Sequence, residues 1–163
     1  MSRSAPRAAA AVLLLLAGCS SEATVKPLLS GAAVPLPPPG TWALSVDGCP
    51  EPKQCDDLRT AIVGHLVGAG LAARIAPPGQ AGDLMLDVHV TRVRSVSTVS
   101  RAIIGTFAGR NVVAGTDTLR DPAGTVLRSV EIEAESAAHP LSGETTLLDA
   151  ERTFATETVT ALR

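Results

Sequence analysis

Between residues 41 and 136 the chain repeatedly alternates apolar and polar residues, which predicts β-strands because successive strand side chains point to opposite faces. The clearest run is DLMLDVHVTRVRSVS, residues 83–97, whose alternation slips near Arg92–Arg94 and so predicts a bulge there. Further strands are predicted at 41–48, 71–76, 112–121 and 125–136. The apolar side of the two longest runs consists of Leu84, Leu86, Val88 and Val90, and of Val130, Ile132 and Ala134.

Two other segments have the three-to-four-residue spacing of an amphipathic helix. The first begins at Asp56, a good N-cap, and is stopped by Gly68 and Gly70. The second, residues 145–163, closes the chain. The side chains expected to be buried are Leu58, Ala61, Ile62, His65, Leu66 and Ala69 in the first, and Leu148, Phe154 or Ala155, Val159 and Leu162 in the second.

The order strand, helix, four strands, helix predicts an α+β domain: a mostly antiparallel sheet of about five strands with two helices packed on one face. We place this single domain at residues 41–163. Ser20–Gly40 is rich in proline and small residues and sustains no period. We therefore expect residues 19–40 to form a flexible tether.

Residues 1–18 have the pattern of a secretory signal peptide, because two arginines precede an uninterrupted apolar run at Ala8–Leu16. That run is shorter than the roughly 20 residues that a membrane-spanning helix needs. The segment ends in LAGC, residues 16–19, which resembles the lipobox of bacterial lipoproteins. The resemblance implies that the Cys19 sulfur accepts a diacylglyceryl group, that cleavage precedes Cys19, and that the new amine is acylated, for example with palmitate.

Several acyl chains on one residue would anchor the protein durably, whereas a single chain binds a membrane only reversibly. The competing interpretation is a small buried cysteine in an apolar segment. Ser20 follows the cysteine, in place of the aspartate that is associated with inner-membrane retention. The resemblance therefore implies a lipoprotein of the outer membrane that faces the periplasm.

The other two cysteines, Cys49 and Cys55, flank two prolines in DGCPEPKQCDD. In an exported chain, such a close pair predicts a disulfide that joins a strand end to a helix start. A metal site is the alternative, but the spacing matches no zinc pattern and no histidine is near in sequence. We expect no metal.

Composition narrows the function further. The formal charge is −2, and the aromatic residues are two Phe and one Trp with no Tyr. A nucleic-acid binder would need a basic surface and stacking aromatics, so this class is excluded. Gly105 and Gly109 do not follow a phosphate-binding spacing, and we expect no cofactor.

Three segments resemble a known family: SRAIIGTFAGRN (100–111), LRDPAGTVL (119–127), and the terminal helix after LSGETT (141–146). They are similar to the bacterial proteins grouped as domain of unknown function 4410, over roughly residues 41–163. The family brings no catalytic residues to carry over. The resemblance implies a non-enzymatic lipoprotein of the cell envelope.

Asp87 and His89 lie two residues apart on the polar side of a predicted strand, with Asp83 further along. A carboxylate beside a histidine can act as a general base or bind a metal. No third group is placed by the spacing, so a solvated sheet face is the simpler interpretation. A small hydrolase using Asp87 and His89 remains an alternative function.

Two features are candidates for partner contact. Glu131, Glu133 and Glu135 form a row of carboxylates about 7 Å apart, either a docking stripe for a basic partner or a solvated face. The arginines expected to balance a solvated face are Arg92, Arg94 and Arg120. The second feature is an apolar segment between two arginines, which would either contact a partner or fold back onto the sheet: Arg101, Ile103, Ile104, Phe107 and Arg110.

The function that we expect is a non-catalytic, lipid-anchored periplasmic protein that binds or scaffolds another envelope component, protein or glycan. The alternatives are the small hydrolase and a protein that binds a small ligand in a cleft beside the glycines.

Overall fold

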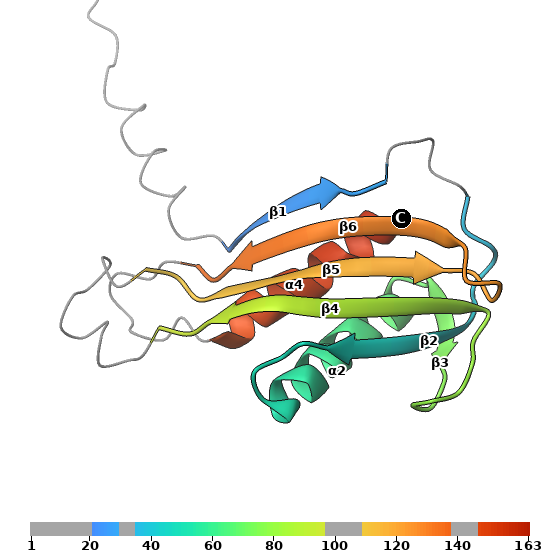
Figure 1. Ribbon diagram of the computed structural model, residues 1–163, viewed down its shortest axis with the longest axis horizontal. Coiled ribbons are helices and arrows are strands. Elements are labelled where there is room, and N and C mark those ends of the chain that lie inside the picture. Colours follow the sequence, from blue (N-terminus) through green and yellow to red (C-terminus); the bar gives the residue numbers. More distant parts are fainter. Residues whose placement is uncertain (1–20, 30–34, 97–108, 138–146) are drawn as a thin grey trace, which may run out of the picture.

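The computed structural model describes residues 21–29, 35–96, 109–137 and 147–163. It confirms the α+β class, and Figure 1 shows a single curved sheet with two helices. The elements are β1 (Glu22–Pro27), β2 (Gly40–Asp47), α2 (Pro52–Gly68), β3 (Ala72–Ile75), β4 (Leu84–Arg94), β5 (Val112–Arg120), β6 (Val126–Glu135) and α4 (Leu147–Leu162).

The sheet has six strands in the order β1-β6-β5-β4-β2-β3. Strands β4, β5, β6 and β1 pair antiparallel, whereas β2 pairs parallel with both β3 and β4. The sheet is therefore mostly antiparallel, as predicted, but it has one strand more than the five expected and two parallel pairs. The parallel pairs arise because α2 is a crossover connection: it returns the chain to the end of the sheet at which β2 begins, so that β3 runs in the same direction as β2.

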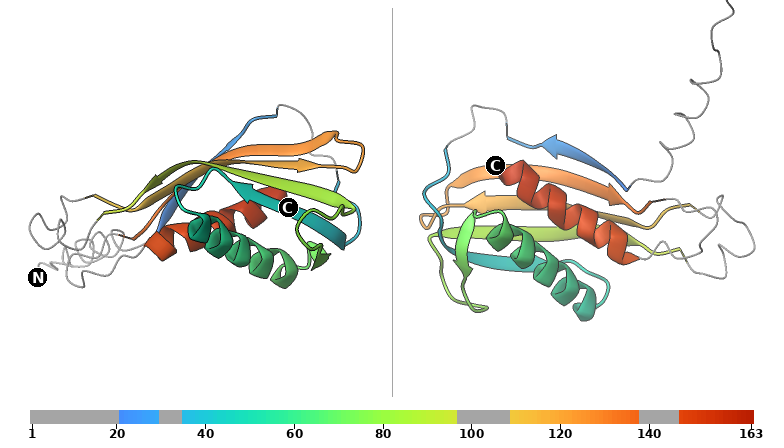
Figure 2. Two further views of the ribbon diagram at one scale, coloured as in Figure 1. Left: turned by 60° about the horizontal axis from the view of Figure 1, so that its bottom comes forward. Right: turned by 180° about the vertical axis from the view of Figure 1, so that it is seen from behind.

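Both helices lie on one face of the sheet, as predicted, and the views in Figure 2 show them side by side beneath it. The core lies between these two layers. The apolar sides predicted for β4 and β6 are buried, and the β4–β5 register shifts between Val90 and Arg92, where the bulge was predicted. No helix in the described ranges is long and apolar enough to cross a membrane.

The helix boundaries differ slightly from those predicted. Helix α2 begins at Pro52 and not at Asp56, because proline fits the first turn, where an N–H would have no partner. It buries Leu58, Ile62 and Leu66 as predicted, but His65 is exposed, and Ala61 and Ala69 are only partly buried. Helix α4 buries Phe154, Ala155, Val159 and Leu162 as expected. Leu148 was predicted to be buried, but it is 44% exposed, and its neighbour Leu147 packs against the core in its place.

The segment expected to be a flexible tether contains a strand. Residues 22–27 form β1, which pairs with β6 from Glu22 opposite Glu135 to Pro27 opposite Val130. Only Val25 is even half-buried, so β1 lacks the apolar alternation by which the other strands were found. Its backbone pairing continues past Pro27, where the Leu28 N–H donates to the Ser129 carbonyl oxygen at 2.8 Å.

The predicted disulfide is present. Cys49 and Cys55 are bonded, with their Cα atoms 5.6 Å apart. Cys49 follows the end of β2 and Cys55 lies in the first turn of α2, so the bond joins a strand end to a helix start.

Removing this disulfide should destabilise the protein modestly. The loop that it closes is short, so the chain-entropy estimate is about 2 kcal/mol. We expect the double variant Cys49→Ala, Cys55→Ala to lose about that much free energy of unfolding in urea. Dithiothreitol should lower the stability of the wild type by the same amount and leave the variant unchanged. Equal stability of the oxidised and reduced wild type would contradict the prediction.

Candidate functional site

The candidate residues lie on the face of the sheet opposite the helices. Within the described residues no helix covers this face. Side chains alternate along each strand, so the residues next in sequence to the buried Leu44, Leu86 and Ile132 point toward this face. These residues are mostly small or charged.

Cross-strand ion pairs connect the charges on this face. Glu131 pairs with Lys26 at 3.6 Å, and Glu133 pairs with Arg92 at 2.7 Å. Arg110 bridges Glu22 at 3.1 Å and Glu135 at 3.3 Å. The carboxylates of β6 are thus paired with Lys26, Arg92 and Arg110, which come from three neighbouring segments. Of the arginines expected from the sequence to balance this row, only Arg92 does so within the described residues. Such exposed ion pairs contribute little to the stability of the fold. Their main consequence is that these charges are already paired with one another on this face.

Asp87 and His89 project from the same side of β4 but belong to different ion pairs. His89 Nδ1 contacts the Asp47 carboxylate across the parallel β2–β4 pair. The Asp87 carboxylate lies 3.5 Å from the guanidinium of Arg120 on β5. The structure does not join Asp87 and His89 into one site with a third group. The described residues also contain no cluster of three or more His, Cys, Asp or Glu that could hold a metal ion.

A shallow depression of about 410 Å³ lies beside Asp87. It is bounded by β2, β4 and the turn after β3, and Ser45, Met85 and Gln80 line it. Strand β3 pairs only with the first residues of β2, Gly40–Trp42, so among the described residues the depression lies where β2 has no paired strand on that side. It is lined by the edge of strand β2, by small side chains such as Ser45, and by the carboxylate of Asp87.

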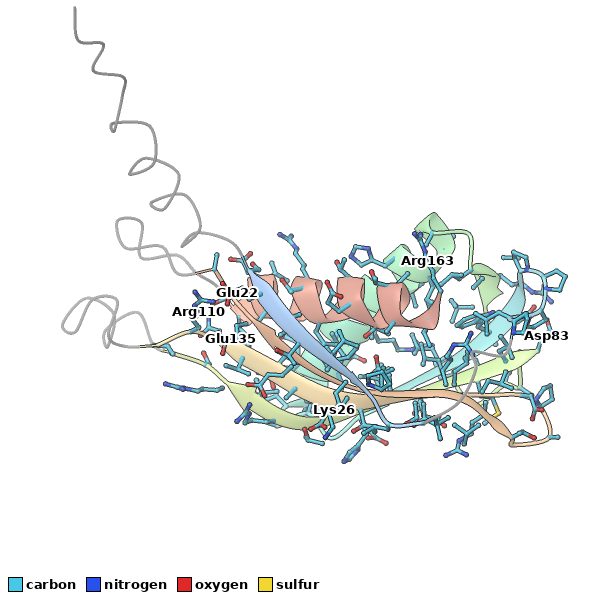
Figure 3. All side chains as sticks on the ribbon, turned by 90° about the horizontal axis from the view of Figure 1, so that it is seen from above. Glu22, Lys26, Asp83, Arg110, Glu135 and Arg163 are labelled. Atoms are coloured by element: carbon cyan, nitrogen blue, oxygen red, sulfur yellow. A yellow bond between two sulfur atoms is a disulfide. The ribbon has the colours of Figure 1, made fainter. Side chains whose placement is uncertain are left out.

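The apolar segment singled out in the sequence falls mostly outside the described residues. Arg101, Ile103, Ile104 and Phe107 are among those outside. Arg110 is described and lies at one end of the sheet, with Glu22 and Glu135 beside it (Figure 3). Its side chain is 25% exposed, less than that of Arg92 or Arg120 in the other ion pairs of this face.

On the helical side, sequence analysis missed a buried carboxylate. Asp117 on β5 is 1% exposed and lies between Val88 and Val130 in the sheet register. Neither of its carboxylate oxygens has a hydrogen bond of normal geometry among the described residues. Burial raises the pKa of Asp117 to about 7, and the nearby Thr158 hydroxyl on α4 offsets part of the rise. The signal was present in the sequence, because Asp117 occupies an apolar position of the alternation between Val113 and Leu119.

A second acidic group lies between the helices. Glu151 on α4 is 7% exposed, and its burial, together with the carboxylate of Asp57 on α2, raises its pKa. Lys53 opposes the shift and pairs with Asp57 one turn along α2. This cluster joins the two helices near the surface.

Comparison with known proteins identifies the family. Residues 50–140 match the model of the family called domain of unknown function, DUF4410. The match spans more than half of the chain, so this protein belongs to the DUF4410 family, as the sequence resemblance predicted. No curated protein matches the sequence.

Among solved structures, the fold is similar to that of PelC from Paraburkholderia phytofirmans, solved as a dodecamer. The similarity has a TM-score of 0.63 at 20% identity and covers 86% of this chain and 98% of PelC. A single-residue variant of the same PelC dodecamer gives a TM-score of 0.59 at 21% identity, over 86% of this chain and 97% of that one. At this level of identity the comparison establishes a shared fold.

Proposed function

We propose that this protein is a lipid-anchored, non-catalytic component of the bacterial cell envelope, held in the outer membrane through Cys19. Its domain would face the periplasm and bind or scaffold another envelope component. The observation that carries the binding role is the helix-free face of the sheet, a broad surface of small side chains and cross-strand ion pairs.

The anchor is supported by the signal-like residues 1–18 and by LAGC at residues 16–19. The disulfide between Cys49 and Cys55 agrees with an exported protein, because disulfides persist in oxidising compartments. Strand β1 begins three residues after Cys19, which fits an anchor attached directly to the domain.

A binding role is supported by how the charges are arranged. Asp87 and His89, the strongest catalytic pair from the sequence, are held in separate ion pairs with Arg120 and Asp47. The same face presents backbone edge and small side chains at the depression beside β2. Exposed strand edges of this kind accept a further strand from a partner.

Self-association is one form that the scaffolding could take. The PelC structures with this fold are dodecamers. In the part of the chain that the structure describes, both sides of the sheet offer an edge, at β1 and at the part of β2 that lies beyond its pairing with β3. Joining one edge to the other in successive copies is a head-to-tail contact, which closes into a ring when the rotation permits.

Site-specific photocrosslinking in cells tests the binding role. A benzophenone side chain at Thr116, on the helix-free face, should give covalent adducts with a second component. The same probe at Thr156, exposed on α4, serves as the matched control and should give few. Adducts whose masses are multiples of this chain would identify further copies as the component. Equal yields at Thr116 and Thr156, or no adduct at Thr116, would contradict the proposal.

A further inference from the structure

We infer that the domain stands on the membrane by one end of its sheet, the end that carries Glu22, Arg94 and Arg110, and that this end contacts the lipid headgroups. The inference rests on the lipid anchor proposed for Cys19. It adds an interaction surface and an orientation, which the anchor alone does not specify.

The covalent chain sets the distance. Only Ser20 and Ser21 separate Cys19 from Glu22, the first residue of β1. Three residue steps reach about 11 Å at full extension. Because β1 is paired with β6 over its whole length, the slack of the expected tether is not available on the membrane side of the domain.

Strand register shows which residues share this end. Glu22 lies opposite Glu135, Glu135 opposite Val112, and Val112 opposite Arg94. These residues form one row across β1, β6, β5 and β4. Figure 3 shows Glu22, Arg110 and Glu135 together, with Asp83 at the far end of the molecule.

The chemistry of this end suits a lipid surface. Helix α4 begins here (Figure 2), and its second residue, Leu148, is 44% exposed. Arg94 is exposed, and its guanidinium lies against Gly109, the residue before Arg110. An exposed leucine at this end can enter the headgroup region while Arg94 approaches lipid phosphates.

Standing on this end is favoured over lying on the helix-free face. Lying on that face would remove the ion pairs of Asp47, Asp87 and Glu131 from water together. Standing on the end brings only the Arg110 pairs with Glu22 and Glu135 near the headgroups. An upright sheet also places the β5–β6 turn about 27 Å away, because the nine residues of β5 are separated by eight steps of about 3.4 Å.

Fluorescence quenching by spin-labelled lipid tests this orientation. The full-length lipoprotein, purified from membranes, is placed in vesicles of phosphatidylethanolamine and phosphatidylglycerol with a nitroxide on some headgroups. Bimane is attached at Leu148→Cys, and at Leu28→Cys as the matched control. These two leucines are equally exposed, at 44% and 45%, but Leu28 follows the far end of β1. Arg94→Cys and Ala123→Cys repeat the comparison on the sheet.

We expect quenching severalfold stronger at positions 148 and 94 than at 28 and 123. Inserting twenty Gly/Ser residues between Ser21 and Glu22 should reduce the difference, because a flexible linker of that length spans about 25 Å. Equal quenching at all four positions of a protein shown by mass spectrometry to be lipidated would overturn the orientation and leave the anchor standing. A protein without lipid on Cys19 would overturn both.

Discussion

Replacing Asp117 with asparagine should stabilise the protein at pH 8 by roughly 2 to 4 kcal/mol, the largest gain that we expect from any single substitution. Asp117 is 1% exposed between the sheet and α4, and burial raises its pKa from 3.8 to about 7. The folded state therefore holds this group neutral up to near pH 7, whereas the unfolded chain ionises it near pH 4.

The raised pKa fixes the direction of the pH dependence. The contribution of Asp117 is most favourable below about pH 4, where both states bind the proton. It is lost as the pH rises from about 4 to about 7, because the unfolded state releases the proton first. Above about pH 7 the loss is complete. Asparagine cannot ionise, so the variant should lack this fall in stability.

Urea unfolding at pH 4.5 and pH 8 measures the effect. Asp117→Asn should exceed the wild type only slightly at pH 4.5 and by much more at pH 8. Glu51→Gln serves as the control, because Glu51 is an exposed carboxylate that makes no side-chain cap hydrogen bond to α2. If the wild type and Asp117→Asn lose stability in parallel between the two pH values, burial of Asp117 does not control this dependence.

The second large effect is on the anchor. Cys19→Ser should abolish the incorporation of fatty acid, because a hydroxyl does not replace the thiol on which the diacylglyceryl thioether forms. Cells grown with alkyne-tagged palmitate, followed by click labelling of the purified protein, measure this directly. We expect signal from the wild type and only background from Cys19→Ser.

Ser20→Ala is the matched control for that experiment. It changes the adjacent residue and keeps the thiol, so labelling should persist. Labelling of Cys19→Ser at the level of the wild type would show that the lipid is attached elsewhere. An unlabelled wild type would exclude the anchor.

Much of the fold could be predicted from the sequence because apolar alternation records burial. Residues 83–97 alternate because Leu84, Leu86 and Val88 pack against the helices, while the side chains between them face water. The slip near Arg92 is the bulge that the β4–β5 register shows. The disulfide was also predictable, because Cys49 and Cys55 are close in sequence and flank a strand–helix junction.

Alternation does not record strand direction or edge pairing. Parallel and antiparallel strands alternate alike, so the parallel placement of β2 depended on the α2 crossover. Strand β1 is held by backbone pairing with β6 and buries almost no apolar side chain. Its residues Glu22, Thr24 and Lys26 therefore carried no hydrophobic signal.

The candidate site was predictable only in part. The outward direction of Glu131, Glu133 and Glu135 followed from the pattern, but their partners Lys26 and Arg110 depended on strand order. Asp117 was visible as a carboxylate at an apolar position. Its surroundings, including Thr158 from the distant terminal helix, are a tertiary property.

The central claim is that Cys19 becomes the first residue and carries lipid. Mass spectrometry of the intact protein from native membranes tests it most directly. We predict a chain that begins at Cys19, with the added mass of a diacylglyceryl thioether and an amide-linked fatty acid. A free thiol at Cys19, or residues 1–18 still attached, would contradict it.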